Sequence, residues 1–230
     1  PVGNPQNLYL YAFYNMSIGD FFSVTLPLTA VSLVGLSIAS IPLLPNKLPE
    51  QTLERAGIRN ARQLLIYLTL FVLCLLTVFR ILPYIVTTAI IVAVLFLLDR
   101  KLLKEIDFML LLTFVCFFVV SENLGRLDPV RLFLQSLLER SALLTAIGAS
   151  QVISNVPAAI LLSGFTSEWN LLLMGVNVGG LGTLIASLAS LISYKFYAQE
   201  EHSKKGKYIL HFTIVNVIFA IILLFAATLL

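Results

Sequence analysis

Charged residues are scarce in this sequence. They make up 12% of its 230 residues, against 59% hydrophobic residues, and the mean hydropathy is +0.96. Soluble domains carry about 25% charged residues, so this composition excludes an ordinary soluble enzyme or nucleic-acid-binding domain. The small excess of Lys and Arg lies in polar loops, as in membrane proteins whose orientation follows loop charge. We therefore expect an all-α polytopic membrane protein surrounded by the lipid bilayer, with no nucleic acid among its partners.

Cysteine and histidine are too few and too scattered to build a redox or metal centre. Cys74 and Cys116 each stand alone in an apolar run, without the spacing of a disulfide framework or a zinc site. His202 falls in a polar loop and His211 near the end of an apolar segment, and every Asp lies in or near a loop. An intramembrane protease needs its nucleophile and base to meet within the bilayer. We expect no enzyme, no cofactor and no metal other than a coupling Na⁺.

Two apolar segments, residues 141–167 and 169–194, contain no ionisable side chain and are interrupted near the middle. The first contains Ser154-Asn155-Val156-Pro157 and the second Gly179-Gly180-Leu181-Gly182-Thr183. Proline removes a backbone N–H and clashes with the preceding turn, and closely spaced glycines lower helix propensity. A helix can be interrupted at membrane depth only where protein groups, or water in a cavity, form hydrogen bonds with the freed backbone N–H and C=O groups. The breaks therefore predict one ion or substrate site; the alternative is a proline kink beside a small-residue packing face.

The order of apolar and polar stretches predicts three parts. Residues 1–44 hold the second half of a broken helix and one span that ends a first repeat, residues 45–63 form a connector, and residues 64–230 form a second repeat. The second repeat is expected to contain scaffold spans over 64–124, a surface helix over 128–140, a re-entrant hairpin over 141–165, a broken helix over 169–197 and a last span over 208–230. Individual spans are expected at 23–44, 64–79, 82–98 and 108–124, with polar loops at 99–107 and 195–207. A helix needs about 20 apolar residues to span the membrane. By this measure we expect about six full or broken transmembrane helices in addition to the re-entrant hairpin.

Loop charge decides whether segment 141–165 crosses the membrane or enters and returns. If it returns, loops 45–63, 99–107 and 195–207 share one side and collect eleven of the 15 Lys and Arg. If it crosses, the basic residues divide almost evenly between the two sides. The positive-inside rule therefore favours the re-entrant hairpin. We expect these loops to be cytoplasmic and the C-terminus to lie outside, in a bacterial inner membrane.

An internal repeat relates the start of the chain to the second broken helix. When residues 1–14 are placed on 184–197, four residues are identical: Leu8, Tyr11, Phe13 and Tyr14 match Leu191, Tyr194, Phe196 and Tyr197. Each copy is followed by a polar loop and a full span. In the expected topology the two copies run in opposite directions, which is the inverted-repeat architecture of many secondary transporters. The sites of such transporters lie at the repeat interface near the middle of the bilayer.

The two interrupted motifs resemble the second-half signature of the ion transporter superfamily, and Gly3-Asn4-Pro5-Gln6-Asn7 resembles its Gly-x-Pro-x-Asn element. This superfamily includes citrate transporter-like anion permeases, dicarboxylate/sodium symporters, arsenite permeases and sodium/proton antiporters. The resemblance covers essentially the whole chain and implies the C-terminal part of such a transporter, preceded by first-half helices and a first hairpin. It also implies a homodimer that moves small anions by alternating access, coupled to Na⁺ or H⁺.

Because the broken segments lack ionisable side chains, we expect amides, hydroxyls, backbone carbonyls and helix ends to hold substrate and ion. The residues expected to bind substrate are Asn155, Val156, Thr183 and Asn7. Those expected to coordinate the ion are Ser154, Asn155, Gly180, Gly182, Asn4 and Asn7, and those expected to break helices are Pro157, Gly179 and Pro5. Plainer alternatives are interhelical hydrogen bonding for the asparagines and packing for the glycines, above all Gly175-x-x-x-Gly179.

Two departures from the family pattern bear on the substrate. The second copy has Leu188-Ala189-Ser190 where Pro-x-Asn is expected, which weakens a side-chain ligand there. The hairpin carries Ser-Asn where some cation-exchanging members carry Asp-Asn, which argues against a carboxylate-based antiporter. Uptake of citrate- or dicarboxylate-like anions is the preferred interpretation. Arsenite permeation, sodium/proton exchange and, less favoured, an ion channel remain open.

Overall fold

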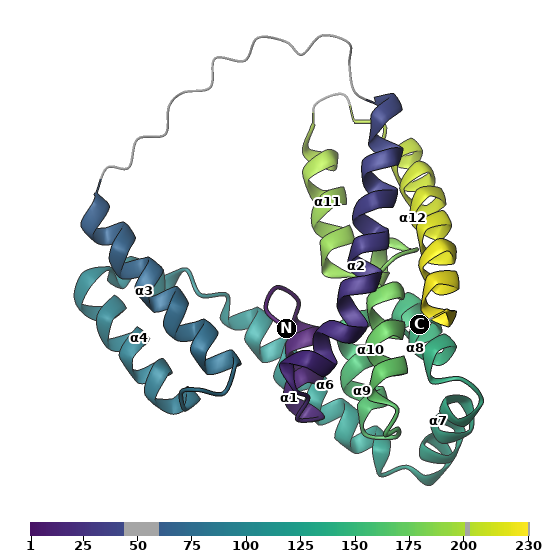
Figure 1. The fold of residues 1–230 in the computed structure, drawn as a ribbon, viewed down its shortest axis with the longest axis horizontal. Helices are drawn as coiled ribbons and strands as arrows, with labels where there is room; N and C mark the ends of the chain where they lie inside the picture. Colours follow the sequence, from purple (N-terminus) through teal and green to yellow (C-terminus); the bar gives the residue numbers. More distant parts are fainter. Residues whose placement is uncertain (44–59, 201–202, 230) are drawn as a thin grey trace. The chain divides into compact units, whose positions relative to one another are not determined.

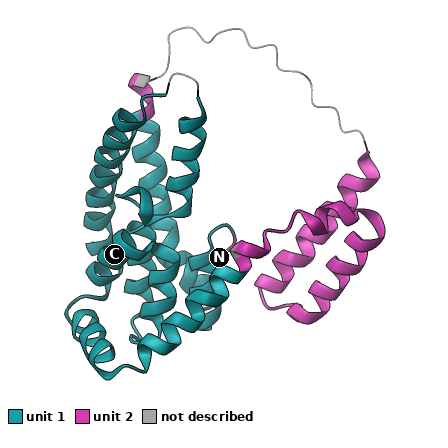
Figure 2. Ribbon diagram, turned by 180° about the vertical axis from the view of Figure 1, so that it is seen from behind, with its two compact units in different colours: residues 1, 3–39, 112–230 teal, residues 2, 40–111 magenta. Residues whose placement is uncertain are grey.

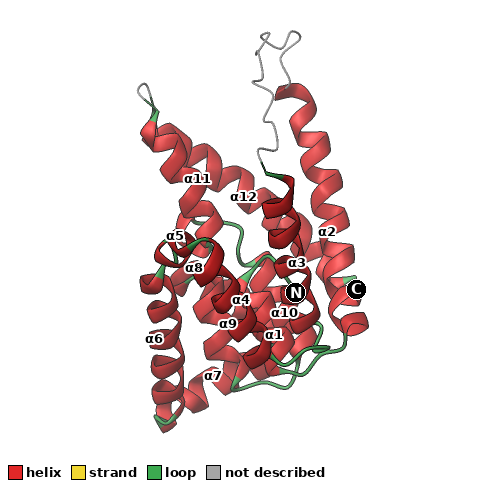
Figure 3. Ribbon diagram, turned by 90° about the vertical axis from the view of Figure 1, so that its left-hand side faces the viewer, coloured by secondary structure: helices red, strands yellow, loops and turns green. Residues whose placement is uncertain are grey.

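The chain is described by a computed structural model that places residues 1–43, 60–200 and 203–229. These residues form helices, turns and loops and contain no strand (Figure 3). The all-α prediction is therefore confirmed. The structure divides into two compact units, one formed by residues 1, 3–39 and 112–230 and the other by residues 2 and 40–111 (Figure 2).

The larger unit contains both interrupted segments (Figure 1). Its helices are α1 (Pro5–Phe13), α2 (Ile18–Ser40), most of α6 (Phe108–Gly125), α7 (Asp128–Arg140), α8 (Ala142–Ile153), α9 (Asn155–Ser163), α10 (Trp169–Val178), the 3-10 helix η2 (Leu184–Ala186), α11 (Leu188–Gln199) and α12 (Lys205–Thr228). The helix predicted over 128–140 coincides with α7. The predicted hairpin segment contains α8 and α9, and the predicted broken helix contains α10, η2 and α11.

The smaller unit is built around two helices that pack against each other, α3 (Ala61–Val78) and α4 (Tyr84–Leu98). The hydroxyls of Thr77 and Thr87 lie 2.6 Å apart between them. The 3-10 helix η1 (Ile41–Leu43) and the short α5 (Arg100–Lys104) also belong to this unit. The helical pair of α3 and α4 occupies the segments expected as spans at 64–79 and 82–98, but of the two only α3 is long enough to count as a candidate membrane span. Most of the connector expected at 45–63 lies outside the described residues.

The first long helix, α2, begins earlier than the sequence predicts, at Ile18 rather than Ser23. A reciprocal capping pair explains the difference. The Ser17 hydroxyl accepts a hydrogen bond from the Asp20 N–H, and the Asp20 carboxylate accepts one from the Ser17 N–H. Pro27 consequently lies inside the helix instead of near its start.

Two segments predicted as loops are partly helical. The Asp99 side chain accepts a hydrogen bond from the Lys101 N–H and caps α5 within the segment 99–107. The segment 195–207 is shortened from both sides, because α11 runs to Gln199 and α12 begins at Lys205.

The core of the larger unit lies where α1, α8, α9 and α10 contact one another. Its tightest contact joins α8 and α10 through small residues. A Cβ added at Gly175 would lie 2.6 Å from Ala146 Cβ, and one added at Gly179 would lie 2.8 Å from Ser150 Cβ. Small residues allow such close helix contact in membrane proteins, and Gly175 and Gly179 lie where α8 and α10 approach each other closely.

The outer faces of the long helices are apolar. Among the described residues, α2, α3 and α12 are long and apolar enough to cross a bilayer. Leu33 of α2 is 66% exposed and Phe225 of α12 is 67% exposed. Large apolar side chains exposed along whole helices are stable in contact with lipid but unfavourable in contact with water. These helices are therefore those of an integral membrane protein.

Candidate functional site

The first interruption is a single residue, Ser154, between α8 and α9. Its backbone has φ +73° and ψ 153°, which takes the chain out of helical geometry. Its carbonyl accepts the Ala158 N–H and so starts the first turn of α9. Pro157 lies in that first turn, where a missing N–H breaks no intrahelical hydrogen bond. The motif therefore ends one helix and begins another, as the sequence predicts.

The second interruption is the segment 179–187 between α10 and α11, and the side chain of Gln151 on α8 holds its first part. The Gln151 amide nitrogen Nε2 donates to the carbonyls of Gly179 and Leu181, both at 2.8 Å. Its Oε1 accepts the Thr183 N–H at 3.0 Å. One neutral side chain thus satisfies three backbone groups that an unbroken helix would have paired internally.

A third helix begins beside these two interruptions. α1 starts at Pro5, after Gly3 at φ +123° and an extended Asn4. Proline suits this first helical position, because its fixed φ matches the helix and it has no N–H to leave unpaired.

These three helix starts line one cavity of about 180 Å³. Its lining residues are Asn4, Pro5 and Gln6 from the start of α1; Asn155 and Val156 from the start of α9; Ser187, Leu188 and Ala189 from the start of α11; and Asn177, Gly180 and Leu181 from the end of α10. No ionisable side chain is among them. The first N–H groups of a helix have no intrahelical acceptor and carry partial positive charge. Three such ends around a neutral cavity favour a small anion.

Two buried amides reinforce this arrangement. The side chains of Asn155 and Gln6 line the cavity in residues only 5% and 4% exposed, and neither makes a hydrogen bond with any described residue. Among the described residues no side-chain N or O atom is buried without a hydrogen-bond partner, so these two amide groups are open to the cavity. Together they offer four N–H donors and two carbonyl oxygens to whatever occupies the cavity.

The other predicted site residues lie nearby but not on this cavity. Asn7 Oδ1 accepts a hydrogen bond of 2.7 Å from Asn177 Nδ2, and Asn7 lines an adjoining cavity of about 260 Å³. Thr183 is bonded to Gln151 through its N–H. The Ser154 hydroxyl lies 3.4 Å from the Ala186 carbonyl oxygen.

Of the predicted residues, the structure thus brings together Asn4, Pro5, Asn155, Val156 and Gly180. Gly182 packs instead against the Gln151 side chain.

Gln6, Asn177 and Gln151 were not among the residues predicted to form the site. Gln6 lies in the motif Gly3-Asn4-Pro5-Gln6-Asn7, of which Asn4, Pro5 and Asn7 were predicted to belong to the site. Asn177 and Gln151 each stand in a long segment without ionisable residues, where an isolated amide is itself a signal of hydrogen bonding between helices.

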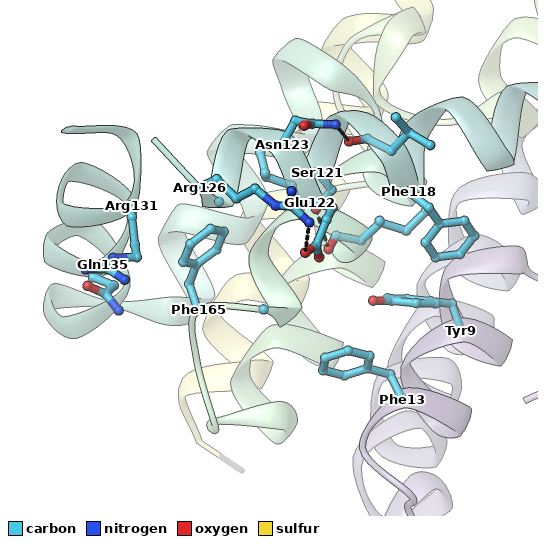
Figure 4. Close-up of a pocket in the computed structure, with 15 residues that line it drawn as sticks. Tyr9, Phe13, Phe118, Ser121, Glu122, Asn123, Arg126, Arg131, Gln135 and Phe165 are labelled. Atoms are coloured by element: carbon cyan, nitrogen blue, oxygen red, sulfur yellow. Dashed lines mark hydrogen bonds and ion pairs between the residues drawn. The ribbon is translucent and has the colours of Figure 1, made fainter. Parts of the chain in front are cut away.

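A larger hollow of about 940 Å³ lies elsewhere in the unit (Figure 4). The rings of Tyr9, Phe13, Phe118 and Phe165 line it together with charged and polar side chains of α6 and α7. Its Arg126 and Glu122 pair with each other at 3.2 Å and are about 70% exposed. None of the predicted site residues lines this hollow, so the small neutral cavity is the better candidate.

Comparison with known proteins gives the family. Residues 1–168 match the family model described as citrate transporter. The chain belongs to the citrate transporter family.

Two curated relatives extend the similarity over most of the chain. An uncharacterized transporter of Methanocaldococcus jannaschii is 34% identical over 223 residues, which cover 97% of the chain and 60% of that protein. The inner membrane protein YbiR of Escherichia coli is 32% identical over 202 residues, or 85% of the chain and 53% of that protein. The chain thus spans a little over half the length of these relatives. No solved structure matches it at a comparable level.

Proposed function

We propose that the chain forms the second part of a secondary active transporter for small anions of the citrate or dicarboxylate type. The observation that carries this proposal is the neutral cavity where α1, α9 and α11 begin, with the unpartnered amides of Asn155 and Gln6 facing it. Oriented N–H groups and helix ends stabilise carboxylate oxygens without a fixed countercharge. A site of this kind releases its ligand more easily than one built on buried arginine, as a carrier must.

The geometry also supports the proposed inverted repeat. When residues 1–14 are placed on 184–197, Asn4 falls on Ser187, and these two residues precede the first helical residues of α1 and α11. Both have extended backbones, at φ −128° and φ −150°. Helices α1 and α11 thus begin at equivalent positions of the two repeats, and the starts of both line the cavity. A site between two inverted repeats is typical of secondary transporters that work by alternating access.

The remaining parts of the proposal concern topology and coupling. In it, α8 and α9 form a re-entrant hairpin entered from outside, loops 45–63, 99–107 and 195–207 are cytoplasmic, and two copies form a dimer. Na⁺ or H⁺ is the coupling ion, with Ser154, Gly180 and Gly182 supplying oxygen to a cation. Asn155 and Asn4 complete the substrate site, while Asn7 and Thr183 support it through their bonds to Asn177 and Gln151.

Uptake measurements in proteoliposomes test the proposal. Radiolabelled citrate and succinate are offered with and without an inward Na⁺ or H⁺ gradient, to wild type, Asn155→Ala and the matched control Asn170→Ala. Asn170 is an exposed asparagine at the start of α10. We expect gradient-driven accumulation that Asn155→Ala lowers at least tenfold, because a lost hydrogen bond to a charged group is worth about 1.5–3 kcal/mol.

The control and the substrates separate the alternatives. Asn170→Ala should transport like wild type. Equal uptake by Asn155→Ala would place the substrate elsewhere, and downhill flux without accumulation would indicate a channel. Arsenite transport or sodium/proton exchange, with no uptake of either carboxylate, would replace the anion proposal by another activity of the same superfamily.

A further inference from the structure

Gln151 occupies a special position on α8, three residues before Ser154. Its side chain reaches across to the segment 179–183 and forms three hydrogen bonds with the backbone there, using both N–H donors and the carbonyl oxygen. Nε2 donates to the carbonyls of Gly179 and Leu181, and Oε1 accepts from the Thr183 N–H. The Gln151 carbonyl also lies 3.4 Å from the Thr183 hydroxyl. This one residue therefore sets the path of the unwound segment.

The bonds to Gln151 divide the carbonyls of this segment into two sets. Those of Gly179 and Leu181 are occupied by Nε2. Those of Gly180 and Gly182 accept no hydrogen bond from any described residue. Carbonyl oxygens left free in an unwound membrane helix are the usual ligands of a coupling cation in secondary transporters.

The segment fits tightly around its neighbours. Gly182 has φ +117°, and a Cβ there would run into Gln151 Oε1. A Cβ at Gly180 would lie 2.8 Å from the amide nitrogen of Asn155. The two glycines with free carbonyls are therefore held between Gln151 on one helix and Asn155 on the next. A shift in either side chain would move these oxygens.

We infer that Gln151 is the positioning residue of a cation site, and that it keeps the carbonyls of Gly180 and Gly182 free and fixed for a monovalent cation. This inference rests on the proposed transport function, because it assigns a task to one part of that site. A glutamine suits the task chemically. Its amide offers two N–H donors for two carbonyls and an acceptor for an N–H on an arm one methylene longer than that of asparagine, and it adds no charge to compete with the cation.

The plainer alternative is that Gln151 only ties α8 to the neighbouring segment. The two roles differ in what a substitution changes. A structural tie would alter stability and maximal rate, whereas a positioning residue alters the cation concentration that gives half-maximal transport.

The test compares wild type with Gln151→Met, which keeps the length of the side chain and removes its hydrogen bonds. Gln151→Asn keeps the amide on a shorter arm and serves as the milder variant if the first folds poorly. Gln199→Met makes the same chemical change at the exposed end of α11 and is the control. Three quantities are measured: the Na⁺ dependence of uptake, equilibrium binding of radioactive Na⁺ to the purified protein, and hydrogen exchange of peptides that cover residues 179–187.

We expect Gln151→Met to raise the half-maximal Na⁺ concentration roughly tenfold or more, since two buried carbonyls lose their donors and the segment relaxes. The maximal rate at saturating Na⁺ and the KM for the anion should stay within about twofold of wild type. Exchange at 179–187 should quicken, and Gln151→Asn should fall between the two. Gln199→Met should match wild type in all three measurements.

Other outcomes overturn the inference. Faster exchange with an unchanged Na⁺ dependence would make Gln151 a structural tie. Wild-type uptake driven by protons and indifferent to Na⁺ would remove the cation site and leave the anion carrier standing. If wild type transports none of the substrates, the proposed function fails. The Na⁺-binding measurement then decides by itself whether Gln151 positions a cation site. A wild-type protein that binds no Na⁺ overturns the inference, and binding weakened about tenfold by Gln151→Met supports it.

Discussion

The contact between α8 and α10 allows a prediction in which two glycine-to-alanine changes have opposite signs. Gly175 lies inside α10 and Gly148 inside α8, so in both helices alanine gains up to about 1 kcal/mol of helix propensity. At Gly148 an added Cβ meets nothing within 4 Å. At Gly175 it would lie 2.6 Å from Ala146 Cβ and 2.8 Å from the Leu143 carbonyl oxygen.

The magnitudes follow from these distances. Carbon atoms pack best at roughly 3.5–4.0 Å, so Gly175→Ala must push α8 and α10 apart by about 1 Å. Overpacking of this kind costs about 1–3 kcal/mol, which exceeds the gain in propensity. We therefore expect Gly175→Ala to destabilise by about 1–2 kcal/mol and Gly148→Ala to stabilise by about 0.5–1 kcal/mol. For a chain of this size each kcal/mol moves Tm by about 2–4 °C.

Thermal stability in detergent, followed by fluorescence-detected size-exclusion chromatography, measures both changes. Adding Ala146→Gly to Gly175→Ala removes the nearest contact and should restore part of the loss. The pair should show a coupling energy above about 0.5 kcal/mol in a double-mutant cycle. A Gly175→Ala protein as stable as wild type, or one that Ala146→Gly fails to improve, would refute the close contact between α8 and α10.

Two further substitutions test other parts of the larger unit. Tyr14→Phe removes the hydroxyl that donates to the Ser163 carbonyl at 3.1 Å and the Thr166 carbonyl at 2.8 Å, and should lower stability by about 1 kcal/mol in the same thermal assay. Gly182→Ala forces a side chain into a backbone with φ +117° and against Gln151, and should lower stability by about 1–3 kcal/mol and weaken the cation dependence of transport.

Matched changes at open positions serve as controls for this pair. Tyr84 is 72% exposed, and a Cβ at Gly206 meets nothing within 4 Å. Tyr84→Phe should therefore stay within about 0.5 kcal/mol of wild type, and Gly206→Ala, in the first turn of α12, should not destabilise the protein. A loss at Tyr84 as large as that at Tyr14, or a Gly182→Ala protein of normal stability, would contradict the reasoning.

Much of the helical layout could be predicted from the sequence, because it follows from local chemistry. Pro157 can stand only near a helix start or at a kink, and the cluster of Gly179, Gly180 and Gly182 cannot sustain a helix. The bounds of α7 followed from an amphipathic pattern between polar turns. The prediction missed the start of α2, where the reciprocal capping of Ser17 and Asp20 begins the helix before its apolar run, and it missed α5, which the Asp99 side chain caps within a polar segment.

The candidate site was predicted less completely. Asn155, Val156, Gly180, Asn4 and Pro5 were identified by motif and do line one cavity. The motif could not indicate that Gly182 and Thr183 contact Gln151 instead, nor that the Gln6 amide opens onto the cavity. Those facts depend on which side of each half-helix meets its neighbour, and sequence spacing alone leaves that side undetermined.

By itself, the sequence determined that this chain is helical, apolar on its outer faces and interrupted at two neutral motifs. These properties are local, because composition and backbone chemistry act over a few residues. Only the tertiary structure decided that the starts of α1, α9 and α11 meet around one cavity. It also decided which carbonyls of the unwound segment accept hydrogen bonds from Gln151 and which remain free. Such contacts join residues 28 to 170 positions apart. They depend on which faces of the close-packed helices meet, which residues near in sequence do not determine.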